Sequence, residues 1–266
     1  MLKDITLGQY FPGDTIAHRL DPRTKIILVI LYIIGLFNAE GWLSYIIVTG
    51  LTCVVLLVSK VTWRNIFNGL KPMVIIIILT GLLNMFYTTG TPLWPGAPVT
   101  VEGLKRAVKM ILRIMLLITG TFTLTYTTSP MALTDGLEIL MGPLKKIKVP
   151  VHEITLMMSM ALRFIPTLIE ETDKIMSAQK ARGADFETGG LVKRAKALVP
   201  VLVPLFVSAF RRADELATAM ECRCYNGGEG RTRLKKLEMA RRDYIALILG
   251  VVFAAGIIAM KKLGMP

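Results

Sequence analysis

Five uncharged apolar runs constrain what this chain can fold into more than any other feature of its sequence. They cover residues 26–37, 43–58, 73–87, 114–128 and 244–260. The chain is 53% hydrophobic, above the roughly 45–50% of a soluble domain, and the excess is concentrated in these runs. With a few flanking residues, including Lys and Arg that reach the interface, each run approaches the roughly 17–25 residues of a span. We therefore expect an all-α integral membrane protein with about five transmembrane helices.

The runs divide the chain into three parts. Residues 1–128 are expected to form an N-terminal membrane region with four spans. Residues 129–243 form a cytosolic block, and residues 244–266 form a C-terminal transmembrane helix. We expect no secretory signal peptide, because neither an apolar core nor a small-residue cleavage site follows Lys3 and Asp4.

The positive charge of the chain follows its predicted spans. A net charge of +13 would suggest nucleic acid as a partner of a soluble chain, but here the basic residues flank apolar runs. Arg19, Arg23 and Lys25 precede the first span, whereas the links at 38–42 and 88–102 lack Lys and Arg. Because cytoplasmic loops carry the excess of Lys and Arg, we place the N-terminus and the block after the fourth span inside, and expect no nucleic acid partner.

One basic cluster disagrees with this orientation. It precedes the fourth span, on the side that should be external, and consists of Lys105, Arg106, Lys109 and Arg113. An amphipathic segment lying in the membrane interface would explain the cluster, and the sequence leaves this open.

The block at 129–243 is predicted to contain three helices rather than a loop. Ser129 is a favoured N-cap and Pro130 a favoured first residue, so one helix runs from there to about residue 140. Longer helices follow at about 151–182 and 191–225, with an apolar part and a charged end. The prolines inside them should bend them: Pro166, Pro200 and Pro204. Their length of roughly 45–50 Å suits levers that transmit motion.

A ten-residue pattern occurs twice in this block, 41 residues apart. An aspartate, an aliphatic residue, a small hydroxyl residue, an alanine and an arginine share one register, from Asp173 to Arg182 and from Asp214 to Arg223. Two similar arginine-tipped helices predict a partner with two equivalent sockets, such as an ATPase dimer. The alternatives are a chance match, or arginines that only complement the helix dipole near a C-cap.

Residues that would support catalysis or metal binding are scarce. The only histidines are His18 and His152, and the C-x-C pair of Cys222 and Cys224 lacks a second pair. We therefore expect no metal site, no cofactor and no catalytic residue. The phosphate-binding G-x-x-x-x-G-K-[ST] motif is absent, and the spans lack the charge that an ion-coupled carrier needs. The chain is thus predicted to be a non-catalytic subunit that a partner drives.

Two stretches resemble a known family, the T component of energy-coupling factor transporters. They are residues 18–25 (HRLDPRTK) and residues 177–183 (SAQKARG), and the resemblance extends over nearly the whole chain, including the number and order of spans. In that family two Ala-Arg-Gly motifs end two long coupling helices.

The two coupling motifs match the family to different degrees. Ala181, Arg182 and Gly183 match the first motif in full, whereas the second keeps only its arginine. The second motif reads Cys222, Arg223 and Cys224. A cysteine in place of glycine leaves the cap geometry of the second helix open.

The resemblance implies how such a chain functions. It sits in the cell membrane of a prokaryote between two cytosolic ABC-type ATPases and a substrate-binding membrane subunit that captures a vitamin or a metal ion. Arg182 and Arg223 would each dock in a groove of one ATPase, and closure of the ATPases on ATP would move the coupling helices. That movement would re-orient or release the capture subunit. The sequence does not name the substrate or say whether the two ATPases are identical.

A second class of function is a membrane-bound enzyme that acts on lipid head groups. Its basic cytosolic block would hold phosphates, and Asp173 and Asp214 would supply acid and base. We favour a surface role for both aspartates, paired with Lys or Arg one turn away, and interpret Glu170 and Glu171 as a solvated helix face. A transporter subunit is inert without its partner, which distinguishes it from an enzyme. A self-sufficient channel or carrier is disfavoured by the uncharged spans.

Overall fold

The described part of the chain folds into helices, and the prediction of an all-α protein is confirmed. The computed structural model describes residues 10–91, 100–186, 188, 190–228 and 237–263. Within these ranges the helices form two compact units, which we describe separately. The bundle unit comprises residues 10–136 and 237–263, and the arm unit comprises residues 137–228.

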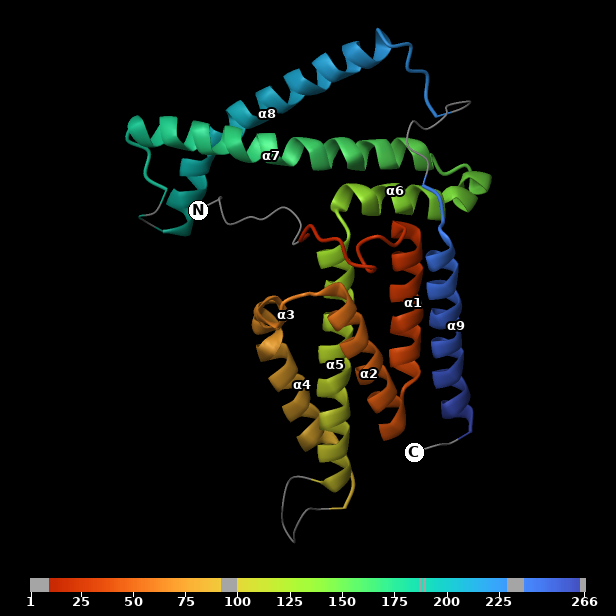
Figure 1. Ribbon diagram of the computed structural model, residues 1–266. Coiled ribbons are helices and arrows are strands. Elements are labelled where there is room, and N and C mark those ends of the chain that lie inside the picture. The colour runs from red at the N-terminus through yellow and green to blue at the C-terminus, as the bar shows by residue number, and fades with distance from the viewer. Residues whose placement is uncertain (1–9, 92–99, 187, 189, 229–236, 264–266) are drawn as a thin grey trace. The chain divides into compact units, whose positions relative to one another are not determined.

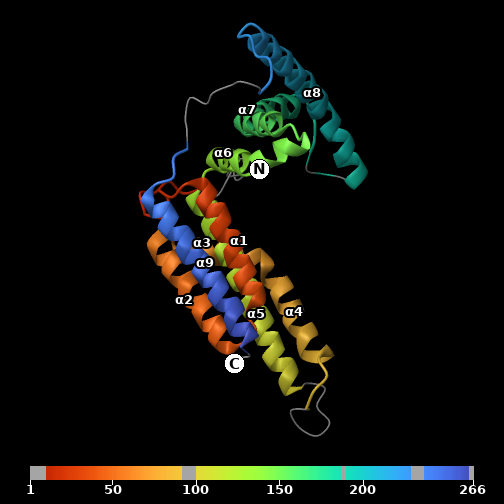
Figure 2. The same ribbon diagram turned by 90° about the vertical axis from the view of Figure 1, so that its right-hand side faces the viewer.

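The bundle unit contains the predicted spans. Its elements are α1 (Pro22–Asn38), α2 (Trp42–Ser59), α3 (Trp63–Leu70), η2 (Lys71–Met73), α4 (Val74–Tyr87), α5 (Val101–Thr127) and α9 (Arg241–Lys262). Helix α6 (Pro130–Leu140) begins in this unit and ends in the arm unit. Figures 1 and 2 show α1, α2, α4, α5 and α9 running alongside one another.

Four helical stretches in the described part of the chain are long and apolar enough to cross a membrane. They are α2, α5, α9 and the stretch of α3, η2 and α4 at 63–87. Helix α1 has 17 residues, at the lower limit of about 17 residues for a span. The chain is therefore a multi-pass membrane protein, and a fifth span at residues 26–37 stays a prediction.

Glycines permit the closest helix contacts of the bundle unit. Helix α1 packs against α9, α5 and α2, and α5 packs against α4, α3 and α2. A Cβ on Gly120 of α5 would meet the Tyr32 ring at 2.4 Å, and one on Gly250 of α9 would meet Leu28 at 2.5 Å. Small residues that allow such approach are typical of helix interfaces in lipid.

Much apolar surface of the bundle unit is not covered by the chain. The exposed apolar side chains of α4 are Val74, Ile75, Ile76, Ile78, Leu79, Leu82, Leu83 and Phe86. A monomeric soluble protein rarely shows so continuous an apolar patch. Lipid is the natural solvent for this surface, which supports a location in the membrane.

A buried polar cluster joins the start of α1 to α9 and α5. Asp21 caps α1 by accepting a hydrogen bond from the N–H of Arg23 at 2.9 Å. The carboxylate of Asp243, 1% exposed, accepts hydrogen bonds from the N–H of Asp21 at 2.8 Å and of the residue before α9 at 2.9 Å. Lys25 Nζ donates to the Thr127 carbonyl at the end of α5, at 2.8 Å. The polar residues of the 18–25 stretch thus hold three helices together.

Two basic residues of α5 hydrogen-bond to the backbone at the end of α1. Lys109 Nζ donates to the Glu40 carbonyl at 2.6 Å, and Arg113 donates to the Ala39 carbonyl at 2.8 Å. The last carbonyls of a helix lack intrahelical partners, and basic side chains satisfy them well. Because α5 is one continuous helix of 27 residues, residues 105–113 are its first part and not a separate surface segment. These hydrogen bonds therefore explain why Lys109 and Arg113 occur on the side where the positive-inside rule predicts few basic residues.

The arm unit contains the two long helices predicted after the fourth span. It consists of the end of α6, η3 (Gly142–Ile147), α7 (Val151–Ala181) and α8 (Leu191–Glu221). The predicted ends of the long helices, at about 182 and 225, lie within four residues of those observed. Pro166 lies inside α7, and Pro200 and Pro204 lie inside α8. Figure 1 shows the first turns of α8 at an angle to its remaining length, as expected of a helix with internal prolines.

We predict that Asp243→Asn destabilises the bundle unit. The amide would direct an NH2 group toward a backbone N–H that now donates to a carboxylate. A buried donor left without an acceptor costs about 1–3 kcal/mol, so the Tm of the protein in detergent should fall. The matched control is Asp14→Asn, because the Asp14 side chain is 95% exposed and its exchange should leave the Tm unchanged. Equal Tm values for wild type and Asp243→Asn would contradict this role.

Candidate functional site

The candidate site consists of the C-terminal ends of α7 and α8. All six residues predicted there are exposed: Ala181, Arg182, Gly183, Cys222, Arg223 and Cys224. Neither guanidinium group has a hydrogen-bond or ion-pair partner among the residues that the structure describes. An arginine carries five N–H donors and a permanent charge. Both groups are therefore exposed, with donors that no described residue occupies.

Helix α7 ends in a Schellman motif directly after Arg182. The N–H of Gly183 donates to the Lys180 carbonyl at 3.0 Å, and the N–H of Ala184 donates to the Gln179 carbonyl at 3.0 Å. Gly183 has a φ of +86°, a left-handed conformation that glycine adopts without steric cost. The chain therefore turns away immediately after Arg182 and leaves the arginine at the tip of the helix.

Helix α8 ends in the same motif although glycine is absent. The N–H of Cys224 donates to the Glu221 carbonyl at 2.8 Å, and the N–H of Tyr225 donates to the Met220 carbonyl at 3.0 Å. These are the two bonds of the first motif, shifted by the repeat period. Cys224 has a φ of +55°, which costs a residue with a Cβ roughly 1–2 kcal/mol. The cap geometry that the sequence left open is therefore the same at both helix ends.

The small hydroxyl residue of the repeat has the same contact in both copies. Ser177 Oγ donates to the Asp173 carbonyl at 2.7 Å, and Thr218 Oγ1 donates to the Asp214 carbonyl at 2.9 Å. Each is a bond from a hydroxyl to the carbonyl one helical turn earlier. The same bond occurs at Thr172 and at other helical Ser and Thr residues of the chain, so it follows from helix geometry, and the shared feature of the two copies is their cap.

An ion pair joins α7 to α8. Arg212 lies 2.8 Å from Oε2 of Glu171, and the Ser208 hydroxyl donates to the other oxygen of the same carboxylate. The Arg212 side chain is 35% exposed and that of Glu171 23%, so water is partly excluded from the pair. The interpretation of Glu170 and Glu171 as a solvated face is therefore wrong for Glu171, while Glu170 is exposed.

A second contact uses a carbonyl that a proline leaves free. Pro204 has no N–H, so the Pro200 carbonyl lacks its donor within α8. The side-chain amide of Gln179 donates to this carbonyl at 3.3 Å. From Glu171 to Gln179 the contacts advance along α7, while their partners recede along α8 from Ser208 to Pro200. The two helices therefore run antiparallel across this contact.

The antiparallel pairing places the two arginines at opposite ends. Glu171 and Arg212 are separated by the repeat period, and Arg182 and Arg223 each follow by eleven residues. At 1.5 Å per residue, each arginine lies roughly 17 Å along its helix from this pair, in opposite directions. In Figure 1 the C-terminal ends of α7 and α8 lie on opposite sides of the arm unit. The two guanidinium groups are thus related by an approximate two-fold axis at the Glu171–Arg212 pair.

The chain that follows Arg223 returns to the start of α7. Gly227 has a φ of +80°, and a Cβ on Gly228 would meet the His152 ring at 2.7 Å. His152 Nδ1 lies 3.2 Å from Oε1 of Glu138 near the end of α6. The segment that follows α8 therefore contacts the start of α7 at Gly228.

Sequence reasoning missed the residues that hold α7 and α8 together. They are Glu171, Gln179, Ser208 and Arg212. One signal for the ion pair was present, because two oppositely charged residues stand one repeat period apart. Gln179 carried no such signal, since its partner is a backbone carbonyl.

The arrangement does not form the acid–base centre that a lipid-head-group enzyme requires. Asp214 is exposed and Asp173 is half-buried, and neither forms the predicted ion pair with a described Lys or Arg. In the ranges that the structure describes, no three His, Cys, Asp or Glu side chains are grouped to hold a metal ion. The two exposed guanidinium groups are suited to binding a carboxylate or a backbone carbonyl.

Comparisons with known proteins point to transporter components. The model of the CbiQ family, described as cobalt transport protein, matches residues 13–234. The chain is 55% identical over 256 residues to the energy-coupling factor transporter transmembrane protein EcfT of Clostridium kluyveri, which covers 95% of both chains. It is 50% identical over 263 residues to EcfT of Ruminiclostridium cellulolyticum, with 98% of both chains covered. It is 43% identical over 265 residues to EcfT of Lactococcus lactis, with 98% of this chain and 99% of the relative covered.

We predict opposite effects of exchanging the two left-handed residues. Gly183→Ala should destabilise the end of α7 by roughly 1–2 kcal/mol, because a Cβ is disfavoured at positive φ. No atom lies within 4 Å of that Cβ, so backbone strain alone is tested. Cys224→Gly should relieve the same strain and stabilise the end of α8. Hydrogen exchange of the amides at 180–184 and 221–225 measures both effects.

The control for the cap exchanges is Gly142→Ala. Gly142 also has open space around its Cβ position but does not have a positive φ, so the added methyl group should not accelerate exchange. Unchanged exchange in Gly183→Ala would show that the cap does not order the end of α7.

We predict that the Glu171–Arg212 pair can be reversed. Glu171→Arg or Arg212→Glu alone places like charges together and should lower the Tm in detergent, whereas the double exchange should recover most of the loss. A coupling energy of about 1 kcal/mol is expected for a partly exposed pair. The matched controls, Glu170→Arg and Arg211→Glu, make the same exchanges at exposed neighbours. Additive effects of the two exchanges would contradict the contact.

Proposed function

This chain belongs to the EcfT family, the transmembrane proteins of energy-coupling factor transporters, and on that premise we propose that it couples two cytosolic ABC-type ATPases to a substrate-capturing membrane subunit. One observation carries the proposal. Arg182 and Arg223 stand after the same backbone cap, at opposite ends of one antiparallel helix pair. Two equivalent arginine side chains related by an approximate two-fold axis suit two similar ATPases, each with one binding groove.

The chemistry of the two arginine side chains fits a groove lined by carboxylates or backbone carbonyls. A guanidinium is planar, permanently charged and less strongly hydrated than an ammonium, so it is well suited to a buried interface. The residues beside each arginine are small, which lets a groove close around it: Ala181, Gly183, Cys222 and Cys224.

The tie between α7 and α8 supports a role in transmitting motion. When the ATPases close on ATP, the distance between their sockets would change. The helices are held together at Glu171 and Arg212, and each continues for roughly 17 Å to its arginine. A change in the distance between the two ATPase grooves would therefore change the crossing angle between α7 and α8. Helix α6 is shared by the arm and bundle units, so a covalent path leads from one unit to the other.

A surface of α8 is suited to the capture subunit, which would bind a vitamin or a metal ion. Its exposed apolar side chains are Val199, Leu202, Val203, Phe206, Val207 and Phe210. Exposed apolar patches of this kind are typical of contacts with another protein or with a membrane. We propose that the capture subunit rests on this surface.

The organisation that accompanies this function has three parts. Four spans lie in residues 1–128, the coupling helices lie on the cytoplasmic side in residues 129–243, and residues 244–266 form the last span. The N-terminus is cytoplasmic, and the host is the cell membrane of a prokaryote. The chain itself is non-catalytic, and its partners hydrolyse ATP.

We predict that Arg182→Glu with Arg223→Glu removes the ATPases from the chain. An interface arginine of this kind contributes about 2 kcal/mol or more, so each exchange should weaken its contact by roughly thirtyfold or more. Because each arginine is proposed to contact a different ATPase, single variants should retain one ATPase per chain and the double variant none. The tagged chain is co-expressed with the ATPases of the same genome, and the subunit ratio is measured after purification.

The matched control reverses two exposed arginines that lie elsewhere on the same helices. Arg163→Glu on α7 with Arg211→Glu on α8 changes the net charge equally and should leave the ATPase ratio as in wild type. If the Arg182 and Arg223 variants keep both ATPases and support uptake, the arginines are helix-end residues only and the assignment of the site is wrong.

A further inference from the structure

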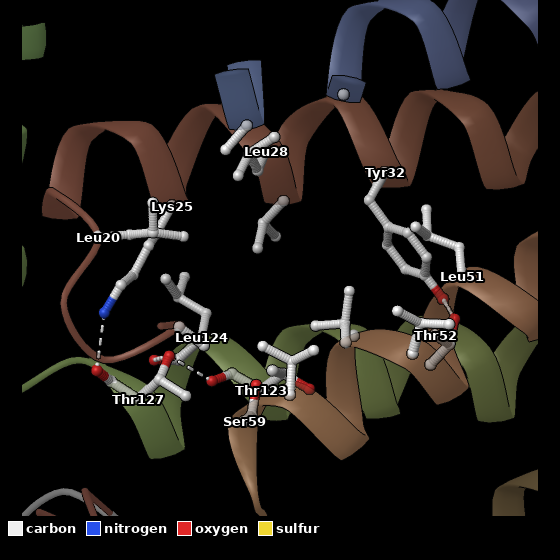
Figure 3. A pocket seen from close by; sticks show the side chains of 18 of the residues that line it. Leu20, Lys25, Leu28, Tyr32, Leu51, Thr52, Ser59, Thr123, Leu124 and Thr127 are labelled. Carbon is white, nitrogen blue, oxygen red and sulfur yellow. Dashed lines mark hydrogen bonds between the residues drawn. The ribbon is translucent and has the colours of Figure 1, made fainter. Parts of the chain in front are cut away.

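A cavity of about 380 Å³ lies in the bundle unit between α1, α2, α5 and α9. Its lining is almost entirely apolar. In Figure 3, Lys25 and Thr127 lie toward one end of the cavity, and Tyr32 and Thr52 lie toward the other. The proposed coupling function does not use this cavity.

The mouth of the cavity has an apolar rim. Its exposed lining residues are Ile16, Val54, Val55, Val58 and Leu249. Most of them belong to α2 and α9, which are long and apolar enough to cross the membrane. Apolar cavities exclude water, so an opening at this depth is suited to hydrocarbon.

One lining hydroxyl has an unused hydrogen-bonding capacity. Ser59 at the end of α2 is 2% exposed, and its Oγ has no partner among the described residues. The other lining hydroxyls are satisfied within the chain: those of Thr52, Thr123 and Thr127 donate to carbonyls one turn earlier, and that of Tyr32 donates to the Leu116 carbonyl. A buried hydroxyl without a partner therefore points to a ligand with a hydrogen-bond acceptor.

The charges at the Lys25 end of the cavity favour a neutral acceptor over an anion. Lys25 Nζ donates to the carbonyls of His18 at 3.2 Å and Thr127 at 2.8 Å. The carboxylates of Asp21 and Asp243 lie close enough to Lys25 to attract its charge. A bound carboxylate would meet two carboxylates that already compensate this ammonium. An ester carbonyl accepts a hydrogen bond without that repulsion.

The cavity is short enough along α1 to lie within one leaflet of the bilayer. Lys25 and Tyr32 are seven residues apart, so the cavity extends for roughly 10 Å along the helix. This is less than half of the roughly 30 Å hydrocarbon core, so the cavity fits within one leaflet. Its end near Lys25 is at the start of α1, beside basic residues that mark the membrane interface.

We propose that this cavity binds one acyl chain of a membrane phospholipid, with Ser59 Oγ donating a hydrogen bond to the ester carbonyl of that chain. A single acyl chain fits the apolar lining, and its ester carbonyl supplies the acceptor that the Ser59 hydroxyl lacks. A membrane-spanning helix of a partner is less suited to this hydroxyl, because the backbone carbonyls along such a helix are already paired within it.

The test uses the full chain reconstituted in vesicles of phosphatidylethanolamine and phosphatidylglycerol. A small fraction of the phosphatidylglycerol carries a photoreactive diazirine in its acyl chain, and cross-linked residues are mapped by mass spectrometry. We expect cross-links concentrated on Leu51, Val55 and Leu249, at the cavity, above those on Ile75 of α4. Ile75 is 77% exposed and is not part of the cavity lining, so it reports contact with bulk lipid.

Two variants and one matched control define the site. Ala246→Phe fills the cavity and should reduce cross-linking at Leu51 and Val55 to the level of Ile75. Ile248→Phe adds the same ring to a residue of α9 that is 63% exposed and outside the lining, and should change nothing. Ser59→Ala preserves the fold and should weaken saturable labelling about threefold to tenfold, as expected for the loss of one neutral hydrogen bond.

Three outcomes would overturn the proposal. The first is labelling at the cavity no stronger than at Ile75. The second is equal labelling of wild type, Ala246→Phe and Ser59→Ala, all with an unchanged Tm. The third is an Ala246→Phe variant that loses a membrane partner while lipid labelling persists, since the occupant is then a side chain of that partner. None of these results depends on ATPase binding, so the coupling function is tested separately.

Discussion

The arm unit depends on one contact, where Glu171 of α7 meets Arg212 of α8. Both residues stand at the same register of the internal repeat, so the contact between them lies on the approximate two-fold axis of the helix pair. Equivalent residues on such an axis place both helix ends at equal distances from it, which is why the two arginines are presented alike. Without a contact near the axis, the ends of two long, mostly exposed helices would move independently. The positions of the two arginines would then not be coupled.

The bundle unit is held together by a different balance of forces. Lipid solvates apolar side chains as well as other side chains do, so hydrophobic burial does little to bring spans together. The close approach at Gly120 and Gly250 and the buried bonds of Asp243 supply what burial does not. A polar contact that is weak in water is worth more here, because these side chains are buried within the bundle unit. This explains why the charged residues at the start of α1 face inward.

The sequence was sufficient for the helical class, the order of helices and the exposed arginines, because each follows from periodicity and breakers along one segment. It was insufficient where a residue's partner lies far along the chain. Lys109 and Arg113 contradicted the orientation rule because they satisfy carbonyls some 70 residues away, at the end of α1. Glu171 looked solvated because its charge partner follows one repeat period later. Gln179 bonds to a carbonyl that is free only because Pro204 lacks an N–H.

The two helix ends share a backbone but not a surface. A glycine at 183 and a cysteine at 224 adopt the same cap, so the departure of the second motif from Ala-Arg-Gly is no sign of a different helix end. The difference lies in volume, since two thiol side chains flank Arg223 where a methyl group and a hydrogen atom flank Arg182. A socket shaped closely around Ala181 and Gly183 would clash with Cys222 and Cys224. If the proposed ATPases bind here, either both carry the wider groove and hold Arg182 more loosely, or the two ATPases differ.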